Sequence, residues 1–163
     1  MYGKVLQACG WNITNYNFET LDVSGCSAVS DVLVNFFRDR VHTTQLDLIR
    51  KALVTVSNWE KVASFNSSSV NATKVGAAFS IGACRTVDGS VVLDLAYFAI
   101  KTTGKIDNVL SYSFGSERVE CIINYQSMQL NVSQYINMRP SIENKLSSVS
   151  RTIDDLSLEK LTI

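Results

Sequence analysis

Few residues of this chain combine the types and the spacing that catalysis requires. His42 is the only histidine and no Gly-x-Ser-x-Gly turn is present, so a nucleophile–histidine pair would have to form around this one side chain. Its place between two segments of helical periodicity indicates a surface position instead. Glu117 and Glu120 lie near one strand, but paired carboxylates catalyse only within a shared cleft. We therefore expect no catalytic residue and no enzyme; a deep polar pocket would revive the enzyme alternative.

Cofactor and metal sites are not expected either. Neither glycine-rich phosphate-binding pattern occurs in the sequence. Asp154 and Asp155 are adjacent on an expected helix and so point in different directions, which indicates a solvated face rather than a calcium site. The four cysteines are far apart and form no Cys-x-x-Cys pair. We interpret Cys9, Cys26, Cys84 and Cys121 as buried, reduced thiols, and one or two disulfide bridges are the alternative.

Charge and composition narrow the choice of partners. Fifteen basic residues balance fifteen acidic ones and form no stripe, so nucleic-acid binding is not expected. With 46% hydrophobic residues, the 163-residue chain suits one soluble domain over residues 1–163. No apolar run approaches the roughly 20 residues of a membrane-spanning helix. Asn-x-Ser/Thr sequons favour a secreted or released protein, and they begin at Asn12, Asn66, Asn71 and Asn131.

Helical periodicity dominates residues 27–57. Ser27 is a suitable N-cap, and an apolar stripe follows at Val29, Val32, Leu33, Phe36 and Phe37, with Arg40 at its end. After a short break, Thr43 or Thr44 can cap a second helix. Its stripe consists of Leu46, Ile49, Leu53 and Val56. The short connection predicts an antiparallel helical hairpin.

From Trp59 onward the spacing of the apolar residues changes from a period of 3.6 residues to a period of 2 residues. We expect an exposed polar loop at 64–73, followed by antiparallel strands at 75–83, 90–101, 110–114 and 119–132, with an Asp-Gly turn between the first two. The N-terminal stretch 4–18 predicts a strand followed by irregular chain. Between Ser90 and Lys101 both residue parities are apolar, and Asp94, the one charged residue between them, would alone bring water to its face. Because a strand with one solvated face alternates apolar with polar residues, helices are expected on both faces of this sheet.

The C-terminal part predicts a helix with Pro140 in its first turn. A narrow apolar seam runs along it, formed by Ile142, Leu146, Val149, Ile153 and Leu156. The seam packs either on the sheet or on a partner helix, and the shortness of the repeat favours the sheet. Together these elements predict an α+β fold of three layers, with an antiparallel β-sheet flanked by the N-terminal helical hairpin and the C-terminal helix.

The stretch from about Leu46 to Val132 resembles the Cyt-type cytolytic toxins. The resemblance is carried by "LVTVSNWEKV" at 53–62, by the strand "TKVGAAFSIG" at 73–82, and by "LAYFAIKTTGKIDNVLSYSFGSERVECIINY" at 95–125. It implies a sheet wrapped by two helical layers that swing away on lipid binding. The strands between Lys74 and Val132 would then meet membrane or other copies of the chain.

Two functions follow as hypotheses, both without catalysis or cofactor. The first is a membrane-active, toxin-like protein that forms pores or perturbs a lipid membrane and can self-associate. Its membrane or assembly strands would present Val91, Leu93, Leu95, Phe98, Ile100, Leu110, Tyr112, Phe114, Ile123 and Tyr125. The second is a binding or self-assembling module that uses the C-terminal helix seam.

Overall fold

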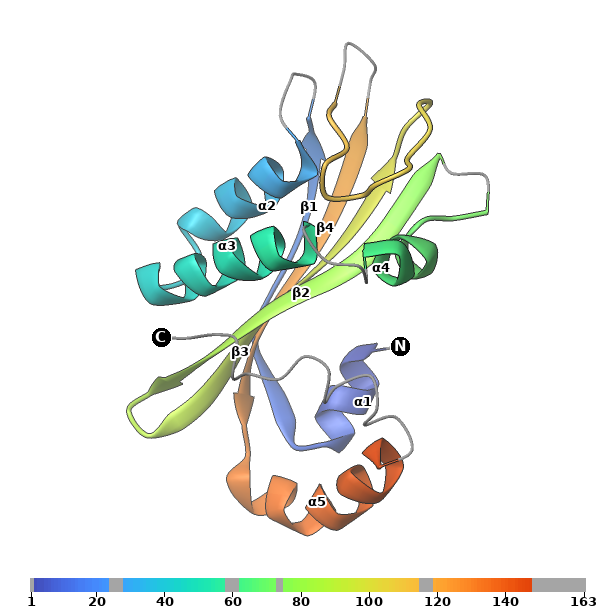
Figure 1. Ribbon diagram of the computed structural model, residues 1–163. Coiled ribbons are helices and arrows are strands. Elements are labelled where there is room, and N and C mark those ends of the chain that lie inside the picture. The colour runs from blue at the N-terminus through green and yellow to red at the C-terminus, as the bar shows by residue number, and fades with distance from the viewer. Residues whose placement is uncertain (1, 24–27, 58–61, 73–74, 115–118, 148–163) are drawn as a thin grey trace. The chain divides into compact units, whose positions relative to one another are not determined.

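The computed structural model describes residues 2–23, 28–57, 62–72, 75–114 and 119–147 (Figure 1). Within these ranges the elements are α1 (Tyr2–Ala8), β1 (Trp11–Asp22), α2 (Val29–Arg38), α3 (Thr43–Ser57), α4 (Val62–Ser69), β2 (Gly76–Val87), β3 (Ser90–Lys101), β4 (Glu120–Leu130) and α5 (Val132–Leu146). The predicted α+β class, with an antiparallel sheet and flanking helices, is confirmed. The chain divides into two compact units, residues 13–128 and residues 1–12 with 129–163.

The larger unit contains the sheet, whose strand order is β1-β4-β3-β2. β2 and β3 form the expected hairpin, in which Phe79 is opposite Phe98 and Val87 is opposite Ser90. Asp88 and Gly89 make the turn with φ angles of 47° and 75°. Two consecutive residues with positive φ are what a tight two-residue hairpin loop requires, and this explains why the Asp-Gly pair was a reliable signal.

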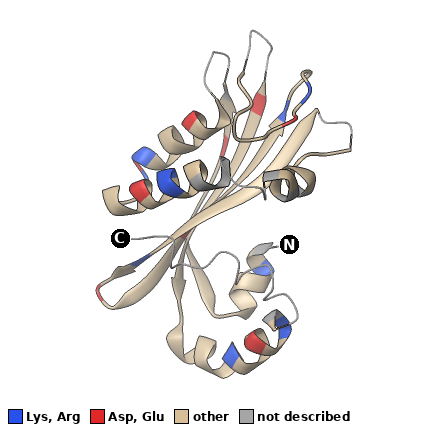
Figure 2. Cartoon of the chain, viewed as in Figure 1, with Lys and Arg blue, Asp and Glu red and all other residues tan. Residues whose placement is uncertain are grey.

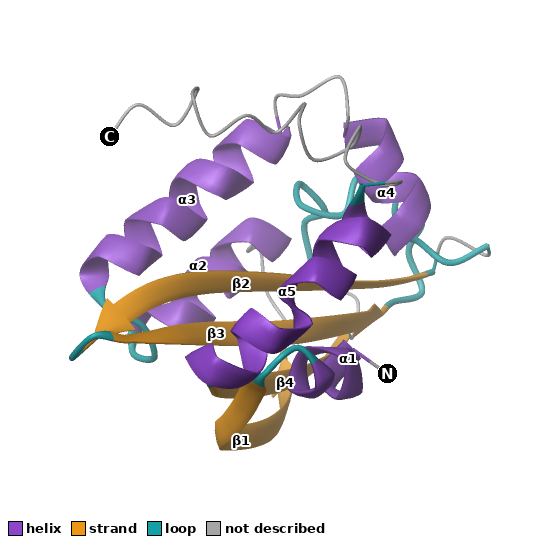
Figure 3. Cartoon of the chain, turned by 90° about the horizontal axis from the view of Figure 1, so that it is seen from below, coloured by secondary structure: helices purple, strands orange, loops and turns teal. Residues whose placement is uncertain are grey.

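The predicted helical hairpin is formed by α2 and α3, which pack on one face of the sheet (Figures 1 and 3). The expected apolar stripe of α2 is buried there. An aromatic cluster joins helix and sheet, because the ring of Phe36 lies 5.5 Å from that of Phe98, which in turn stacks 5.5 Å from Phe79. Burial of each such side chain contributes about 1.5–3 kcal/mol, so this face is the core of the unit.

The start of α3 is stabilised differently from the prediction. The N–H of His42 donates to the side-chain carbonyl of Gln45 at 3.0 Å, and the N–H of Thr44 donates to Nδ1 of His42 at 3.4 Å. His42 therefore takes the capping position that the sequence assigned to Thr43 or Thr44, and the pair resembles a capping box. His42 is exposed, as expected. Ser27 lies outside the described residues.

Three local predictions are wrong. Residues 2–8 are helical, and the strand begins only at Trp11. The expected loop at 64–73 contains helix α4, which is held by the ring of Phe65 against Phe79, 5.8 Å apart. The expected strand at 110–114 is a turn region in which Leu110 and Phe114 are nevertheless buried. Its only β-contact within the described chain is the isolated bridge of Ser113 with Ala28.

In the smaller unit, α1 and α5 are joined near Gly10. The N–H of Asn131 donates to the carbonyl of Gly10 at 2.8 Å, and the Asn131 side chain caps α5 by accepting from the N–H of Gln134 at 3.1 Å. Because of this cap, α5 begins at Val132 and contains Pro140, whereas the sequence suggested a start at Pro140. A helical layer on the second face of the sheet stays a prediction.

Candidate functional site

The two faces of the sheet differ in the polar side chains that they carry. On the face under α2 and α3 lies Asp94, which is only 1% exposed. Its carboxylate accepts hydrogen bonds from the hydroxyl of Tyr125 at 2.8 Å, from Nε2 of Gln45 at 3.2 Å and from Nε of Arg85 at 3.2 Å. A buried carboxylate is tolerated only when it is paired and hydrogen-bonded, and these three donors meet that condition.

This carboxylate ties four elements together. Asp94 lies on β3, Arg85 on β2, Tyr125 on β4 and Gln45 on α3. Burial, together with the hydrogen bond to Asp94 and its negative charge, raises the pKa of the Tyr125 phenol above its ordinary value. With the phenol protonated and Asp94 covered by its donors, the network positions α3 on the sheet and offers no accessible acid or base for catalysis.

The opposite face of the sheet, which we call the open face, carries exposed aromatic side chains. On β3, the alternation that buries Ala96, Phe98 and Ile100 turns Tyr97 the other way, and Tyr97 is 45% exposed. The expectation that neither face meets water is therefore wrong at this position. Its partner on β2 is Ser80, whose side chain is too small to cover the Tyr97 ring.

β1 adds two further aromatic residues to the open face. The side-chain amide of Asn124 donates to the hydroxyl of Tyr16 at 3.2 Å, and Asn124 points away from the core because its neighbour Tyr125 points into it. Tyr16 therefore lies on the open face, and alternation places Phe18 there as well. Tyr16 is 55% and Phe18 56% exposed.

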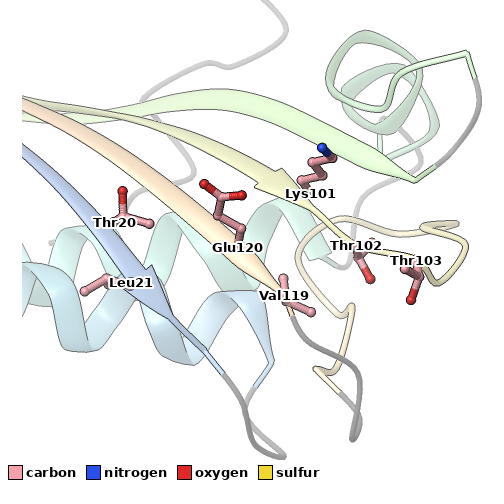
Figure 4. A pocket seen from close by; sticks show the side chains of 7 residues that line it. All are labelled: Thr20, Leu21, Lys101, Thr102, Thr103, Val119 and Glu120. Atoms are coloured by element: carbon pink, nitrogen blue, oxygen red, sulfur yellow. The ribbon is translucent and has the colours of Figure 1, made fainter.

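One end of the open face is polar and borders a pocket of about 590 Å³. The pocket is lined by Thr20, Leu21, Lys101, Thr102, Thr103, Val119 and Glu120. Figure 4 shows Thr20, Glu120 and Lys101 pointing to the same side of the sheet, with one residue supplied by each of three neighbouring strands. The opposite charges of Lys101 and Glu120 thus mark a boundary of the open face.

The interior of the open face is uncharged. By alternation from Thr20, Glu120 and Lys101, the open face also holds Phe18 and Tyr16 on β1, Ile122 and Asn124 on β4, and Ala99 and Tyr97 on β3. Figure 2 shows long stretches of strand without charged residues, whereas the helices and turns carry most of the charge. Apolar surface next to polar residues is typical of a site that binds a membrane or a protein partner.

The residues predicted as membrane or assembly strands divide between the two faces. Val91, Leu93 and Leu95 share the open face with Tyr97 and are half-buried. Tyr112 is partly buried beside the core. The remaining residues of that set are buried in the core of the larger unit, and they are Phe98, Ile100, Leu110, Phe114, Ile123 and Tyr125.

The C-terminal seam is described only at its beginning. Ile142 is half-buried on α5, and Leu146 ends this helix. Val149, Ile153 and Leu156 lie outside the described residues, as do Glu117, Asp154 and Asp155. Self-assembly through this seam stays a prediction.

The structure agrees in part with the prediction that the cysteines are buried, reduced thiols. Cys9, Cys84 and Cys121 are free, and Cys26 lies outside the described residues. Cys121 is buried, and burial raises the pKa of its thiol to about 11. Cys84 is exposed on β2, contrary to the prediction that these thiols are buried.

Sequence reasoning missed the residues that define the open face. Tyr16 and Phe18 fell in a segment interpreted as largely irregular, although their alternation with Asn15 and Asn17 was a signal for a strand. Within the described ranges, no cluster of three or more His, Cys, Asp or Glu side chains is placed to hold a metal ion. In the same part of the chain, each helix is too short or too polar to cross a membrane.

Comparisons with known proteins add little to this geometry. No family model matches the chain, and no curated protein matches it. Among solved structures, a delta-endotoxin matches with 12% sequence identity and a TM-score of 0.42. The match covers 79% of this chain and 65% of the delta-endotoxin chain, so this chain spans slightly less than two thirds of the length of that chain. A score of this size establishes neither family nor function, and the function proposed below is argued from the chain's own residues.

Proposed function

We propose that this protein is a non-enzymatic, membrane-active protein that binds a lipid bilayer through the open face of its sheet. The observation that carries the proposal is the exposure of Tyr16, Phe18 and Tyr97 on one uncharged surface. A soluble monomer rarely leaves contiguous apolar surface exposed without a binding role. The hairpin helices already bury the opposite face, so these aromatic side chains are not required to fill that core.

The composition of the open face suits the boundary between lipid headgroups and acyl chains. Tyrosine side chains combine an apolar ring with a polar hydroxyl and favour this boundary, and phenylalanine adds apolar area below it. Lys101 and Glu120, at the end of the face, would remain in the headgroup region, since charged groups are costly in the hydrocarbon core. An uncharged interior favours neutral over strongly anionic lipids, because it offers no cluster of basic residues.

Binding in this manner requires no unfolding. Pore formation would be a further step, because Phe98, Ile123 and Tyr125 lie beneath α2 and α3 and would have to be uncovered. The two steps are separable in experiment: vesicle association reports the first, and release of a trapped dye reports the second. Export from the cell, which the sequons favour, would bring the protein to an external membrane surface.

The test is co-sedimentation with phosphatidylcholine vesicles, comparing wild type with the variants Phe18→Ser and Tyr97→Ser. Each exposed aromatic ring that inserts contributes about 1.5–3 kcal/mol, so each substitution should lower the vesicle partition coefficient about tenfold or more. Val54→Ser is the matched control, because Val54 is 60% exposed on α3, away from the open face. Equal binding by all three variants, or no binding of wild type to neutral and anionic vesicles alike, would contradict the proposal.

A further inference from the structure

The open face carries a short row of hydrogen-bonded amide and hydroxyl groups. Nε2 of Gln126 donates to Oδ1 of Asn124 at 3.4 Å, and Nδ2 of Asn124 donates to the Tyr16 hydroxyl at 3.2 Å. All three residues belong to the larger unit, on β4 and β1. Because Gln126 is two residues from Asn124 and bonds to its side chain, it lies on the open face as well. We call these three residues the amide row.

Both ends of the amide row have an unused hydrogen-bonding group. At one end, Oε1 of Gln126 is buried and accepts no hydrogen bond from the described residues. Thr14 lies on the same face of β1 as Tyr16, but its hydroxyl donates to the carbonyl of Ser127 at 3.0 Å. At the other end, the Tyr16 hydroxyl accepts from Asn124, and its proton is donated to no acceptor in the described part of the chain.

The unused acceptor is the feature that points to a ligand. Leaving a buried acceptor unpaired is unfavourable, and folded chains rarely do so. The Gln126 side chain is half-buried, so rotation of its terminal amide toward the surface would let Oε1 meet a donor from outside. Tyr16 is 55% exposed and can donate its proton to the same molecule. A ligand that both donates and accepts hydrogen bonds would therefore complete the row.

The surroundings of the amide row restrict the chemistry of this ligand. The charged residues Lys101 and Glu120 lie at the polar end of the open face, and the four residues from Glu120 to Asn124 span about 13 Å. An ionic group at the row would have no counter-charge beside it, which is costly. A neutral sugar needs no counter-charge, because its hydroxyls both donate and accept. Its ring C–H groups form an apolar side that can pack on exposed rings such as Tyr16 and Phe18.

We infer that the amide row binds a neutral sugar ring, presented by a glycolipid headgroup or by a free oligosaccharide. The sugar hydroxyls would accept from the Tyr16 hydroxyl and donate to Oε1 of Gln126, so both unused groups become paired. With a glycolipid, Phe18 and Tyr97 would enter the bilayer while the sugar stays on the row. The inference rests on the proposed function, because it names the class of lipid that the open face selects.

The test is co-sedimentation with phosphatidylcholine vesicles that either contain or lack glucosylceramide. Two added hydrogen bonds should raise the vesicle partition coefficient of wild type about tenfold when the glycolipid is present. Gln126→Leu removes the acceptor, and Tyr16→Phe removes the donor and keeps the ring. In each variant the ratio of the two partition coefficients should fall toward one. The matched control is Asn35→Leu, which also replaces an amide by an apolar group, at an exposed position of α2, and should keep the tenfold ratio.

Soluble sugars distinguish the two sources of the ring. Excess methyl glucoside should displace wild type from the glycolipid vesicles if the ring alone is recognised. Glucuronate, whose carboxylate would find no counter-charge at the row, should not displace it. An unchanged glycolipid ratio in excess methyl glucoside would assign recognition to the sugar held at a membrane surface.

Equal binding of wild type to both kinds of vesicle would overturn this inference and leave the proposed function intact, whereas no binding to either would overturn both. A tenfold ratio retained by Gln126→Leu would also refute the role of the row. The melting temperature gives a readout without lipid. Because Oε1 has no partner within the described chain, Gln126→Leu should not lower the melting temperature. A marked loss of stability would reveal an internal partner for Oε1 and remove the premise.

Discussion

Removal of the Asp94 carboxylate should destabilise the fold more than any loss of a surface charge. The substitution Asp94→Ala leaves the hydroxyl of Tyr125 and the amide of Gln45 without their buried acceptor. It also leaves the Arg85 guanidinium without its counter-ion. Truncating one partner of a buried charged network costs about 3–5 kcal/mol. The Arg85 side chain is 36% exposed and can be rehydrated, so the lower end of that range, about 3 kcal/mol, is expected.

Equilibrium unfolding in urea, followed by tryptophan fluorescence, measures this change. With a denaturant slope of about 2 kcal/mol per molar, the midpoint should fall by about 1.5 M. Asp94→Asn keeps the shape and one acceptor oxygen, so its loss should be smaller. The control is Asp47→Ala, which removes an exposed partner of Arg50 and should cost no more than about 1 kcal/mol. If Asp94→Ala and Asp47→Ala shifted the midpoint equally, the network would contribute nothing to holding α3 on the sheet.

Two further predictions concern burial and backbone conformation. Burial raises the pKa of the Cys121 thiol from 9.0 to about 11, so this thiol loses its proton at lower pH in the unfolded chain than in the folded chain. The stability that its burial contributes is therefore present below pH 9 and is lost as the pH rises toward 11. Relative to Cys121→Ala, the unfolding free energy of wild type should fall by about 2 kcal/mol over that interval, and parallel pH profiles would refute this. Gly10 has a φ of 95°, and a Cβ added there would lie 3.1 Å from backbone atoms of Asn131 and Tyr135. Gly10→Ala should therefore lower the melting temperature more than Gly89→Ala, because a Cβ added at Gly89 has no neighbour within 4 Å. A larger loss at Gly89 would contradict the close approach at Gly10.

The elements that the sequence predicted well are those whose packing is local. The stripe of α2 follows the helical period, and the structure buries Val29, Leu33 and Phe37 as that period requires. The β2–β3 hairpin was predictable because a two-residue turn with positive φ favours Asp-Gly. In both cases the residues that determine the element are neighbours in the sequence.

The elements that the sequence predicted poorly depend on single side-chain hydrogen bonds, one of them local and one of them distant. Leu110 and Phe114 alternate like strand residues, yet the Asn108 side chain accepts from the N–H of Leu110 at 3.1 Å and turns the chain there. Asn66 in α4 accepts from the N–H of Val109 at 3.0 Å, which anchors a segment too polar to be recognised as a helix. No local period reports such contacts.

Asp94 illustrates the same limit for the candidate site. In the sequence, Asp94 is a charged residue among apolar residues of the same strand parity, and the simplest interpretation is that its side chain contacts water. Its partners Gln45 and Tyr125 are 49 and 31 residues away, so the pairing that allows its burial could not be inferred from the strand alone. Conversely, Tyr97 was expected to be covered, and it is exposed beside the small side chain of Ser80, its partner on β2.

The contrast between the two faces bears on function. Under the helices, Asp94 finds three donors, and Phe98 is fully buried among other rings. On the open face, Tyr97 and Phe18 remain exposed although their burial would stabilise the chain by about 1.5–3 kcal/mol each. Residues that fold stability does not require, gathered on one uncharged surface, support the proposal that this face has a binding role. We expect its partner to be a lipid bilayer, as proposed above.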